Sequence, residues 1–227
     1  MVLTPVRILR PEFLTKGCVL YMKMDEGFGN VAHDGSGYGN HGTIYGATWA
    51  DGKFGKALSF DGVNDYVVGQ ISMLDTAPNK TFALWVKVPS AESGAAISFR
   101  LDSTNDNYFN LYPRYSGGEG RIFLSVAWKL WVYDDTGYTL PIDTWCHLVL
   151  TVSTDVIRLY LNGKEIWRAA RTTQPPSAPK EYKLGNRYYA NMPFNGTIDE
   201  VLIYNRALSA EEILALYRGG RFHPFRL

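Results

Sequence analysis

The sequence contains few cysteines and no long apolar run. Cys18 and Cys146 are its two cysteines, so at most one disulfide can form, and their spacing matches neither a zinc knuckle nor a C-x-x-C redox pair. Strand-like apolar residues flank each cysteine, which favours buried free thiols over a disulfide. No apolar segment approaches the length of a membrane span. The sequence therefore predicts no disulfide scaffold, no cysteine-based metal centre and no membrane span.

Neither basic nor acidic residues are in marked excess. The 23 basic and 22 acidic residues leave a formal net charge of +1, so no overall field attracts nucleic acid or an anionic membrane. Nucleic acid is therefore not an expected partner. The first residues, MVLTPVRILRPEFLTKG, carry Arg7 and Arg10 instead of an apolar segment, so no signal peptide is visible and the localisation stays open.

Glycine and aromatic residues are abundant. The chain has 22 Gly, 15 Tyr, 11 Phe and 6 Trp, a composition that suits many short strands joined by tight turns. Asp61-Gly62 and Asn162-Gly163 are turn signals, and the second predicts a type I′ hairpin. A length of 227 residues fits a single β-rich domain. We expect an N-terminal arm over residues 1–17, the domain over 18–217 and a basic, aromatic tail over 218–227.

The end of the domain has a well-defined pattern. A strand is predicted over Ile198–Tyr204 and a helix over Ala210–Tyr217, with Ser209 and Glu212 forming a capping box. Asp199 shares the two-residue phase of the apolar positions 201 and 203, which places its carboxylate at the edge of the core face. An inward carboxylate needs a partner. Strand phase alone favours hydrogen bonds from a nearby turn, and a bound cation is the alternative.

A glycine-rich loop lies between Gly27 and Gly46, with seven glycines in this stretch. Its Asp, Asn and Ser side chains and its turn carbonyls are the hard oxygen ligands that Ca²⁺ prefers, but they are equally typical of a loop held by Asx turns. His33 and His41 also lie here, and two histidines without a cysteine are weak support for zinc, which we set aside.

Aromatic residues recur along the central strands. Trp85 is expected in the core, and a place in a binding surface is the alternative. Alternation should bury about half of the aromatic residues that follow it and leave the rest as an exposed strip beside arginines, an arrangement that stacks on sugar rings. Aromatic residues are also good strand formers in general, so the two explanations stay open. The candidate ligand-binding residues are Tyr108, Tyr112, Trp128, Trp131 and Tyr133. His147 is expected to be structural and not catalytic.

Seven segments in order resemble one known family. They are LYMKMDEGFGN, HDGSGYGNHGTIYGATW, GKFGKALSFDGVNDYV, FALWVKV, WCHLVLTV, IRLYLNGKEI and FNGTIDEVLIYNRALSAEEILALY. Together they resemble the laminin-G-like, concanavalin A-like jelly-roll domains over about Cys18 to Tyr217. The resemblance implies an all-β fold, a two-sheet antiparallel jelly-roll sandwich with one short C-terminal helix, in which the first and last strands lie side by side.

The same resemblance implies one structural Ca²⁺ ion. It makes Asp25 and Asp199 candidate side-chain ligands and Asn40 and His41 candidate loop positions that offer backbone carbonyls. It also favours an extracellular, virion-surface or cell-surface location.

Catalytic patterns are not found in the sequence. Glucanases of the wider superfamily need two carboxylates across the scissile bond, whereas Asp199 and Glu200 are expected to alternate to opposite faces of their strand. We therefore expect no enzyme but a binding module for a glycan or protein ligand. The alternative is a structural protein, such as a virion or surface-array subunit, that assembles through residues 1–17 and 218–227. A divergent glycoside hydrolase is the least favoured reading.

Overall fold

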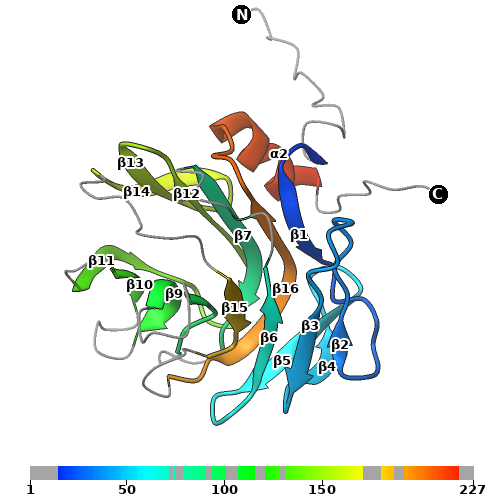
Figure 1. Ribbon diagram of the computed structural model, residues 1–227. Helices are drawn as coiled ribbons and strands as arrows, with labels where there is room; N and C mark the ends of the chain where they lie inside the picture. Colours follow the sequence, from blue (N-terminus) through cyan, green and yellow to red (C-terminus); the bar gives the residue numbers. More distant parts are fainter. Residues whose placement is uncertain are drawn as a thin grey trace, which may run out of the picture.

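Two antiparallel β-sheets packed face to face form the body of the protein in a computed structural model (Figure 1). The structure describes residues 15–71, 74, 79–89, 94–100, 107–115, 121–127, 131–170, 180–186 and 192–219. A helix, α2 (Ala210–Gly219), follows the last strand and packs on the outside of one sheet. The predicted antiparallel sandwich with a short C-terminal helix is therefore confirmed.

The first sheet, sheet A, has eight strands. Their order is β14 (Lys164–Ala170), β13 (Val156–Leu161), β12 (Cys146–Val152), β7 (Lys80–Lys87), β16 (Asn195–Tyr204), β5 (Lys56–Asp61) and β4 (Thr48–Asp51), with β1 (Cys18–Met22) also paired to β16. Asn162 and Gly163 connect β13 to β14 with φ angles of 51° and 80°, as a type I′ turn requires. The predicted hairpin is confirmed.

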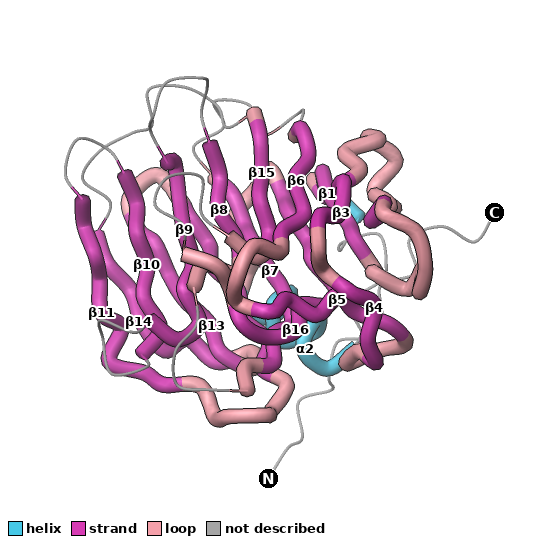
Figure 2. The backbone as a smooth tube through the Cα atoms, turned by 90° about the horizontal axis from the view of Figure 1, so that it is seen from below, coloured by secondary structure: helices cyan, strands magenta, loops and turns pink. Residues whose placement is uncertain are grey.

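The second sheet, sheet B, also has eight strands. Their order is β11 (Trp131–Thr139), β10 (Arg121–Ala127), β9 (Asn107–Tyr115), β8 (Ile97–Arg100), β15 (Glu181–Leu184), β6 (Tyr66–Gln70), β3 (Gly42–Tyr45) and β2 (Val31–Ala32). Figure 2 shows strands β11 to β6 following one another across this sheet. The Asp61-Gly62 turn carries the chain from sheet A to sheet B, because β5 and β6 belong to different sheets.

The core fills the space between the two sheets. Alternate residues of β7, Phe82, Leu84 and Val86, point into it and are fully buried. A second apolar cluster lies on the outer face of sheet A, where Ile213 and Leu216 of α2 belong to the same buried group as residues of β1, β7, β12 and β16. Both cysteines are buried and free, as predicted.

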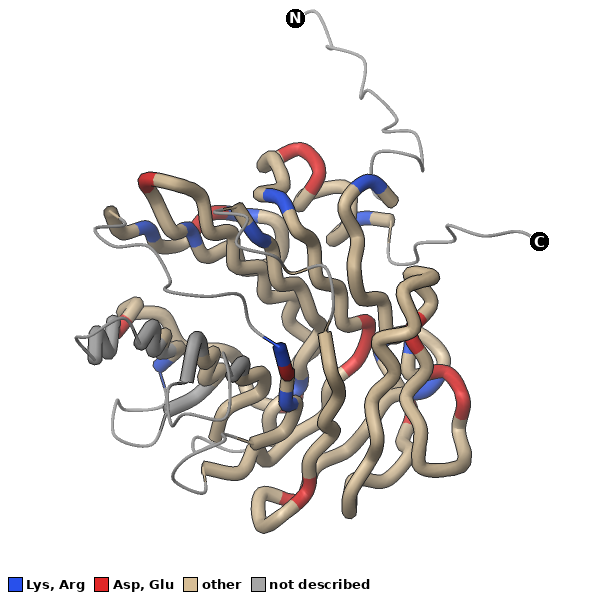
Figure 3. The backbone as a smooth tube through the Cα atoms, viewed as in Figure 1, with Lys and Arg blue, Asp and Glu red and all other residues tan. Residues whose placement is uncertain are grey.

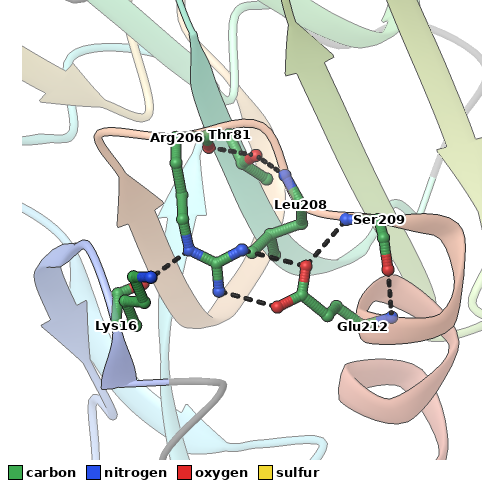
Figure 4. A network of polar contacts seen from close by, with 6 residues as sticks. All are labelled: Lys16, Thr81, Arg206, Leu208, Ser209 and Glu212. Atoms are coloured by element: carbon green, nitrogen blue, oxygen red, sulfur yellow. Dashed lines mark hydrogen bonds and ion pairs between the residues drawn. The ribbon is translucent and has the colours of Figure 1, made fainter.

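The strand β16 connects the parts of sheet A. One edge pairs with β7, while the other edge pairs with β5 over residues 195–198 and with β1 over residues 201–204. The predicted pairing of the first and last strands is therefore confirmed. Ser209 and Glu212 form the predicted capping box, because the Ser209 N–H donates to the Glu212 carboxylate at 2.8 Å and the Glu212 N–H donates to the Ser209 hydroxyl at 3.3 Å (Figure 4).

Helices long and apolar enough to cross a membrane are not found in the part of the chain that the structure describes. Acidic and basic positions lie at many places on both sheets, and neither sign is confined to one face (Figure 3). This distribution agrees with the nearly neutral composition.

Candidate functional site

Asp199 lies on β16 where the neighbouring strand changes from β5 to β1. A β-bulge occurs between Asp199 and Leu202, and Glu200 within it has a positive φ of 49°. Ile198, Val201 and Ile203 all point into the core between the sheets. Asp199 pairs with Trp85, whose ring lies on the outer face of sheet A. The predicted phase of Asp199 is therefore wrong, because the bulge inserts a residue and turns the carboxylate to the outer face.

Glu200 lies on the same side of the sheet as Asp199. Its Oε2 accepts a hydrogen bond of 2.8 Å from the hydroxyl of Tyr21, a member of the outer cluster beneath α2. The expectation that Asp199 and Glu200 point to opposite faces is also wrong, and the same bulge is the reason. The bulge leaves two acidic side chains close together below the surface of sheet A.

Asp25 and Asp199 both contact the turn between β4 and β5. The N–H of Phe54 donates to Asp199 Oδ2 at 3.0 Å, and the N–H of Lys56 donates to Asp25 Oδ1 at 2.9 Å. Gly52 completes this turn, and a Cβ added there would lie 2.7 Å from Asp199 Oδ2. The structure therefore brings the two predicted acidic ligands to one turn, from opposite ends of the chain.

Burial controls the protonation of this acidic pair. Asp199 is 0% exposed and Glu200 is 2% exposed. Removal from water raises the pKa of Asp199 to about 7 and that of Glu200 to about 8. Backbone N–H donors such as that of Phe54 lower the pKa of Asp199, but the effect of burial is larger. Asp199 Oδ1 and Glu200 Oε1 are buried without a hydrogen-bond partner. Two such oxygens need a proton or a cation to offset their burial.

Asn40 and His41 belong to a different network, which is organised around Asp34. The Asp34 carboxylate accepts hydrogen bonds from the N–H groups of Tyr21 and Asn40, both at 2.9 Å, and the Asp34 N–H donates to His41 Nδ1 at 2.9 Å. The Asn40 carbonyl accepts a hydrogen bond of 2.9 Å from the hydroxyl of Tyr182. These contacts hold the glycine-rich loop against β1, so the four predicted metal positions fall into two networks. Across the described ranges, three His, Cys, Asp or Glu side chains do not gather closely enough to hold a metal by themselves.

The predicted aromatic strip falls on sheet B. Tyr112 is fully buried and is therefore not an exposed member of it. Tyr108 lies in β9 and Trp131 and Tyr133 lie in β11, but their side chains are outside the described part of the structure, as is all of Trp128. For these four residues the ligand-binding role stays a prediction. The arm and tail predicted to make assembly contacts likewise lie mostly outside the described residues.

A stacked aromatic pair, one ring exposed and the other half-buried, lies on the same sheet, on β3 and β6. Tyr45 is 47% exposed and stacks on Tyr66 with ring centroids 4.7 Å apart. Lys183 of β15 places its Nζ 4.2 Å from the centroid of the Tyr66 ring. Beside them, the amide of Gln70 donates a hydrogen bond of 2.8 Å to Glu181. Sequence reasoning missed this group because Tyr45 was assigned to the glycine-rich loop, although the alternation of strand β3 was the signal available.

A second aromatic group lies on the outer face of sheet A, next to Asp199. Trp85 contacts Phe54 edge-on at 5.8 Å, stacks on Tyr217 of α2 at 5.7 Å and lies 5.0 Å from the His147 ring. Trp85 is only 4% exposed, so its predicted burial is confirmed, although it is buried outside the sheet sandwich.

Lysines lie over two of the tryptophans on this face. Lys53 Nζ lies 4.8 Å from the Trp85 ring centroid, and Lys87 Nζ lies 5.4 Å from that of Trp145. Burial lowers the pKa of His147 to about 3, so this ring is neutral, in agreement with a structural role.

Solved structures with a similar fold are binding domains or parts of larger proteins. Domain 4 of AbnA, a GH43 extracellular arabinanase from Geobacillus stearothermophilus, was solved with arabinotriose; it is 22% identical, with a TM-score of 0.70 over 88% of this chain and 98% of that one. The binding domain of Paraclostridial Mosquitocidal Protein 1 is 16% identical, with a TM-score of 0.73 over 91% of this chain. The receptor binding domain of botulinum neurotoxin D is 16% identical, with a TM-score of 0.69 over 91% of this chain.

These likenesses concern the fold. The match spans 53% of the mosquitocidal binding domain and 54% of the neurotoxin domain, so this chain corresponds to about half of each. A family model described as the concanavalin A-like lectin/glucanases superfamily, of the laminin G type, matches residues 61–214, which is more than half of the chain. The chain therefore belongs to the concanavalin A-like lectin/glucanase superfamily.

Proposed function

We propose that this protein is a non-catalytic module that binds a saccharide, free or on a receptor, through the outer face of sheet B. The observation that carries the proposal is the stacked pair of the exposed Tyr45 and the half-buried Tyr66 with Lys183 beside it. Aromatic rings offer an apolar platform for the C–H face of a sugar, and neighbouring polar groups hydrogen-bond its hydroxyls. The strands β9 and β11, which carry the predicted positions Tyr108, Trp131 and Tyr133, belong to the same sheet.

The similar structures support a binding role. Domain 4 of the arabinanase was solved with an arabinose oligosaccharide, and the neurotoxin domain is described as receptor-binding. A binding role also agrees with the acidic pair of β16. Asp199 and Glu200 are buried and hydrogen-bonded to Phe54 and Tyr21, so a glycosidic bond in solution does not reach their carboxylates.

A structural Ca²⁺ ion is the second part of the proposal. Asp25 and Asp199 converge on one turn, Asp199 Oδ1 is buried without a partner, and the Lys56 carbonyl lies 2.5 Å from the position of a Cβ on Gly52. Carboxylate and carbonyl oxygens suit Ca²⁺, and backbone carbonyls would complete the shell. A bound ion would neutralise the buried carboxylate and fix the turn between β4 and β5.

Glycan-array binding tests the proposal. Specific binding by the wild-type protein that is weakened in Tyr66→Ala supports it. Release of reducing sugar from the bound glycan would contradict the non-catalytic role.

A further inference from the structure

The outer face of sheet A carries two lysine–tryptophan pairs that the proposed function does not use. We call this group the lysine–tryptophan patch. Its members are Lys53, Phe54, Trp85, Lys87, Trp145 and Tyr217. Trp85 and Lys87 are two residues apart on β7, so their side chains lie on one face of the strand. The patch therefore runs along β7 from helix α2 to the start of β12.

The aromatic rings of the patch have unequal access to solvent. Trp85 is 4% exposed beneath Phe54 and Tyr217 and acts as a support. Trp145 is half-buried, so part of its ring reaches the surface. Lys53 is exposed, and its ammonium already lies against the Trp85 ring. A flexible, exposed side chain in this position is easily displaced by a ligand.

The two charged members of the patch are both lysines. Asp51 is an exposed acid on β4 and forms an ion pair with Lys56 at 2.8 Å. Lys56 lowers the pKa of Asp51, and the more distant Lys87 lowers it further. Asp199 lies below the surface and is 0% exposed. Lys53 and Lys87 therefore each place an ammonium group beside a tryptophan of the patch, and Asp143, two residues before Trp145, is an exposed carboxylate near its end. A Ca²⁺ ion held by Asp25 and Asp199 would make this face more positive still.

An indole face flanked by ammonium groups matches one class of ligand. The apolar face of a sugar ring packs on an indole, and carboxylate or sulfate groups accept hydrogen bonds from lysine. We propose that the lysine–tryptophan patch binds an acidic saccharide, one that carries carboxylates or sulfates. This inference rests on the proposed saccharide-binding function and adds a second surface and a ligand class to it.

The test is a set of tryptophan-fluorescence and calorimetric titrations of the intact protein. The probes are trigalacturonic acid, a sulfated heparin tetrasaccharide and neutral galactotriose, which separate carboxylate, sulfate and uncharged ligands. We expect either acidic probe to bind about tenfold more tightly than the neutral one, and its affinity to fall as salt rises from about 0.05 to 0.5 M. Trp145→Ala and Lys87→Met should each weaken that binding about fivefold.

A matched variant controls for the general loss of a positive charge. Lys180→Met removes an exposed lysine just before β15, in sheet B and therefore away from the patch on sheet A, and should leave acidic-probe binding unchanged. Circular dichroism and thermal melting check that each variant is folded.

Three outcomes would overturn the inference, and they separate it from the proposed function. If Trp145→Ala and Lys87→Met bind the acidic probes as tightly as the wild type and Tyr66→Ala does not bind them, the patch is not the binding site. The proposed saccharide-binding function is then kept. Tighter binding of the neutral probe than of the acidic probes would contradict an acidic saccharide as the ligand. Failure of every probe and of a wider glycan array removes both proposals.

Discussion

Arg206 and Glu212 form two parallel hydrogen bonds, 2.9 Å and 2.8 Å long, across the turn between β16 and α2 (Figure 4). The same guanidinium donates to the Lys16 carbonyl at 2.7 Å, just before β1 begins. Thr81 of β7 adds two further bonds, because its hydroxyl donates to the Arg206 carbonyl and accepts from the Leu208 N–H. This network ties the first strand, the last strand and the helix together.

Replacement of Arg206 by methionine should destabilise the protein by about 1–3 kcal/mol. The change leaves the half-buried Glu212 carboxylate without its ion pair and the Lys16 carbonyl without its donor. Chemical denaturation measures the free energy of unfolding. Arg168→Met is the control, because Arg168 pairs with Glu165 while 64% exposed and should cost less than about 0.5 kcal/mol. Equal losses in the two variants would contradict a special role for Arg206.

Gly52→Ala should destabilise the turn between β4 and β5. A Cβ would lie 2.5 Å from the Lys56 carbonyl and 2.7 Å from Asp199 Oδ2, closer than packed atoms approach, so the turn must move. We expect a loss of about 1–3 kcal/mol in the free energy of unfolding. Gly219→Ala is the control, because no atom lies within 4 Å of a Cβ at that position. An unchanged stability in Gly52→Ala would mean that the turn is not held by Asp199.

Much of the fold could be predicted from the sequence, because its signals are local. The capping box of Ser209 and Glu212 and the Asn162-Gly163 turn depend on residues a few positions apart, and both are confirmed. The face of Asp199 could not be predicted by simple alternation. It depends on the bulge at Glu200, which forms where β16 changes partner from β5 to β1.

The site could be predicted only in part for a similar reason. The convergence of Asp25 and Asp199 followed from the expected pairing of the first and last strands. The lysine–tryptophan patch joins Lys53 of a turn, Trp85 of β7 and Tyr217 of α2, residues far apart in sequence that no periodicity connects. Tyr112 was predicted as a candidate ligand-binding residue, but alternation alone does not say which aromatic residues face outward, and the structure buries it.

Calcium should stabilise the protein, and chelation should reverse the effect. At a hundredfold excess over its Kd, one ion adds about 2.7 kcal/mol to the free energy of unfolding, which appears as a higher Tm in differential scanning calorimetry. Asp199→Asn should abolish this shift, because it removes the buried anionic ligand. The control Asp51→Asn changes an exposed carboxylate on β4 and should keep the shift. If neither calcium nor chelator changes the Tm of the wild-type protein, the proposed metal site is contradicted.

Acid should weaken the contribution of the buried, neutral His147 to stability. The pKa of this buried ring is about 3 when folded and 6.5 when unfolded, so between these values the unfolded chain binds a proton that the folded chain does not. The contribution of His147 to the free energy of unfolding therefore falls as pH drops below 6.5, by about 2 kcal/mol at pH 5. The raised pKa values of Asp199 and Glu200 act in the opposite direction over this range, so the effect of His147 is read as a difference between variant and wild type. His147→Phe keeps an aromatic ring beside Trp85 but has no imidazole to protonate, so it lacks this pH-dependent contribution to the free energy of unfolding. Between pH 7.5 and pH 5, chemical denaturation should show a change in the free energy of unfolding that is about 2 kcal/mol more favourable in His147→Phe than in the wild type, and identical pH profiles would contradict the prediction.

The measurement that tests the saccharide-binding role most directly is glycan-array binding of the wild-type protein, followed by a titration of its best ligand. We predict specific binding without release of reducing sugar, weakened about tenfold or more in Tyr66→Ala. Tyr38→Ala, which removes a tyrosine of the glycine-rich loop that is as exposed as Tyr45, should bind normally. Trp131→Ala extends the test to β11. An array without any specific signal, or hydrolysis of the bound glycan, would contradict a non-catalytic saccharide-binding module.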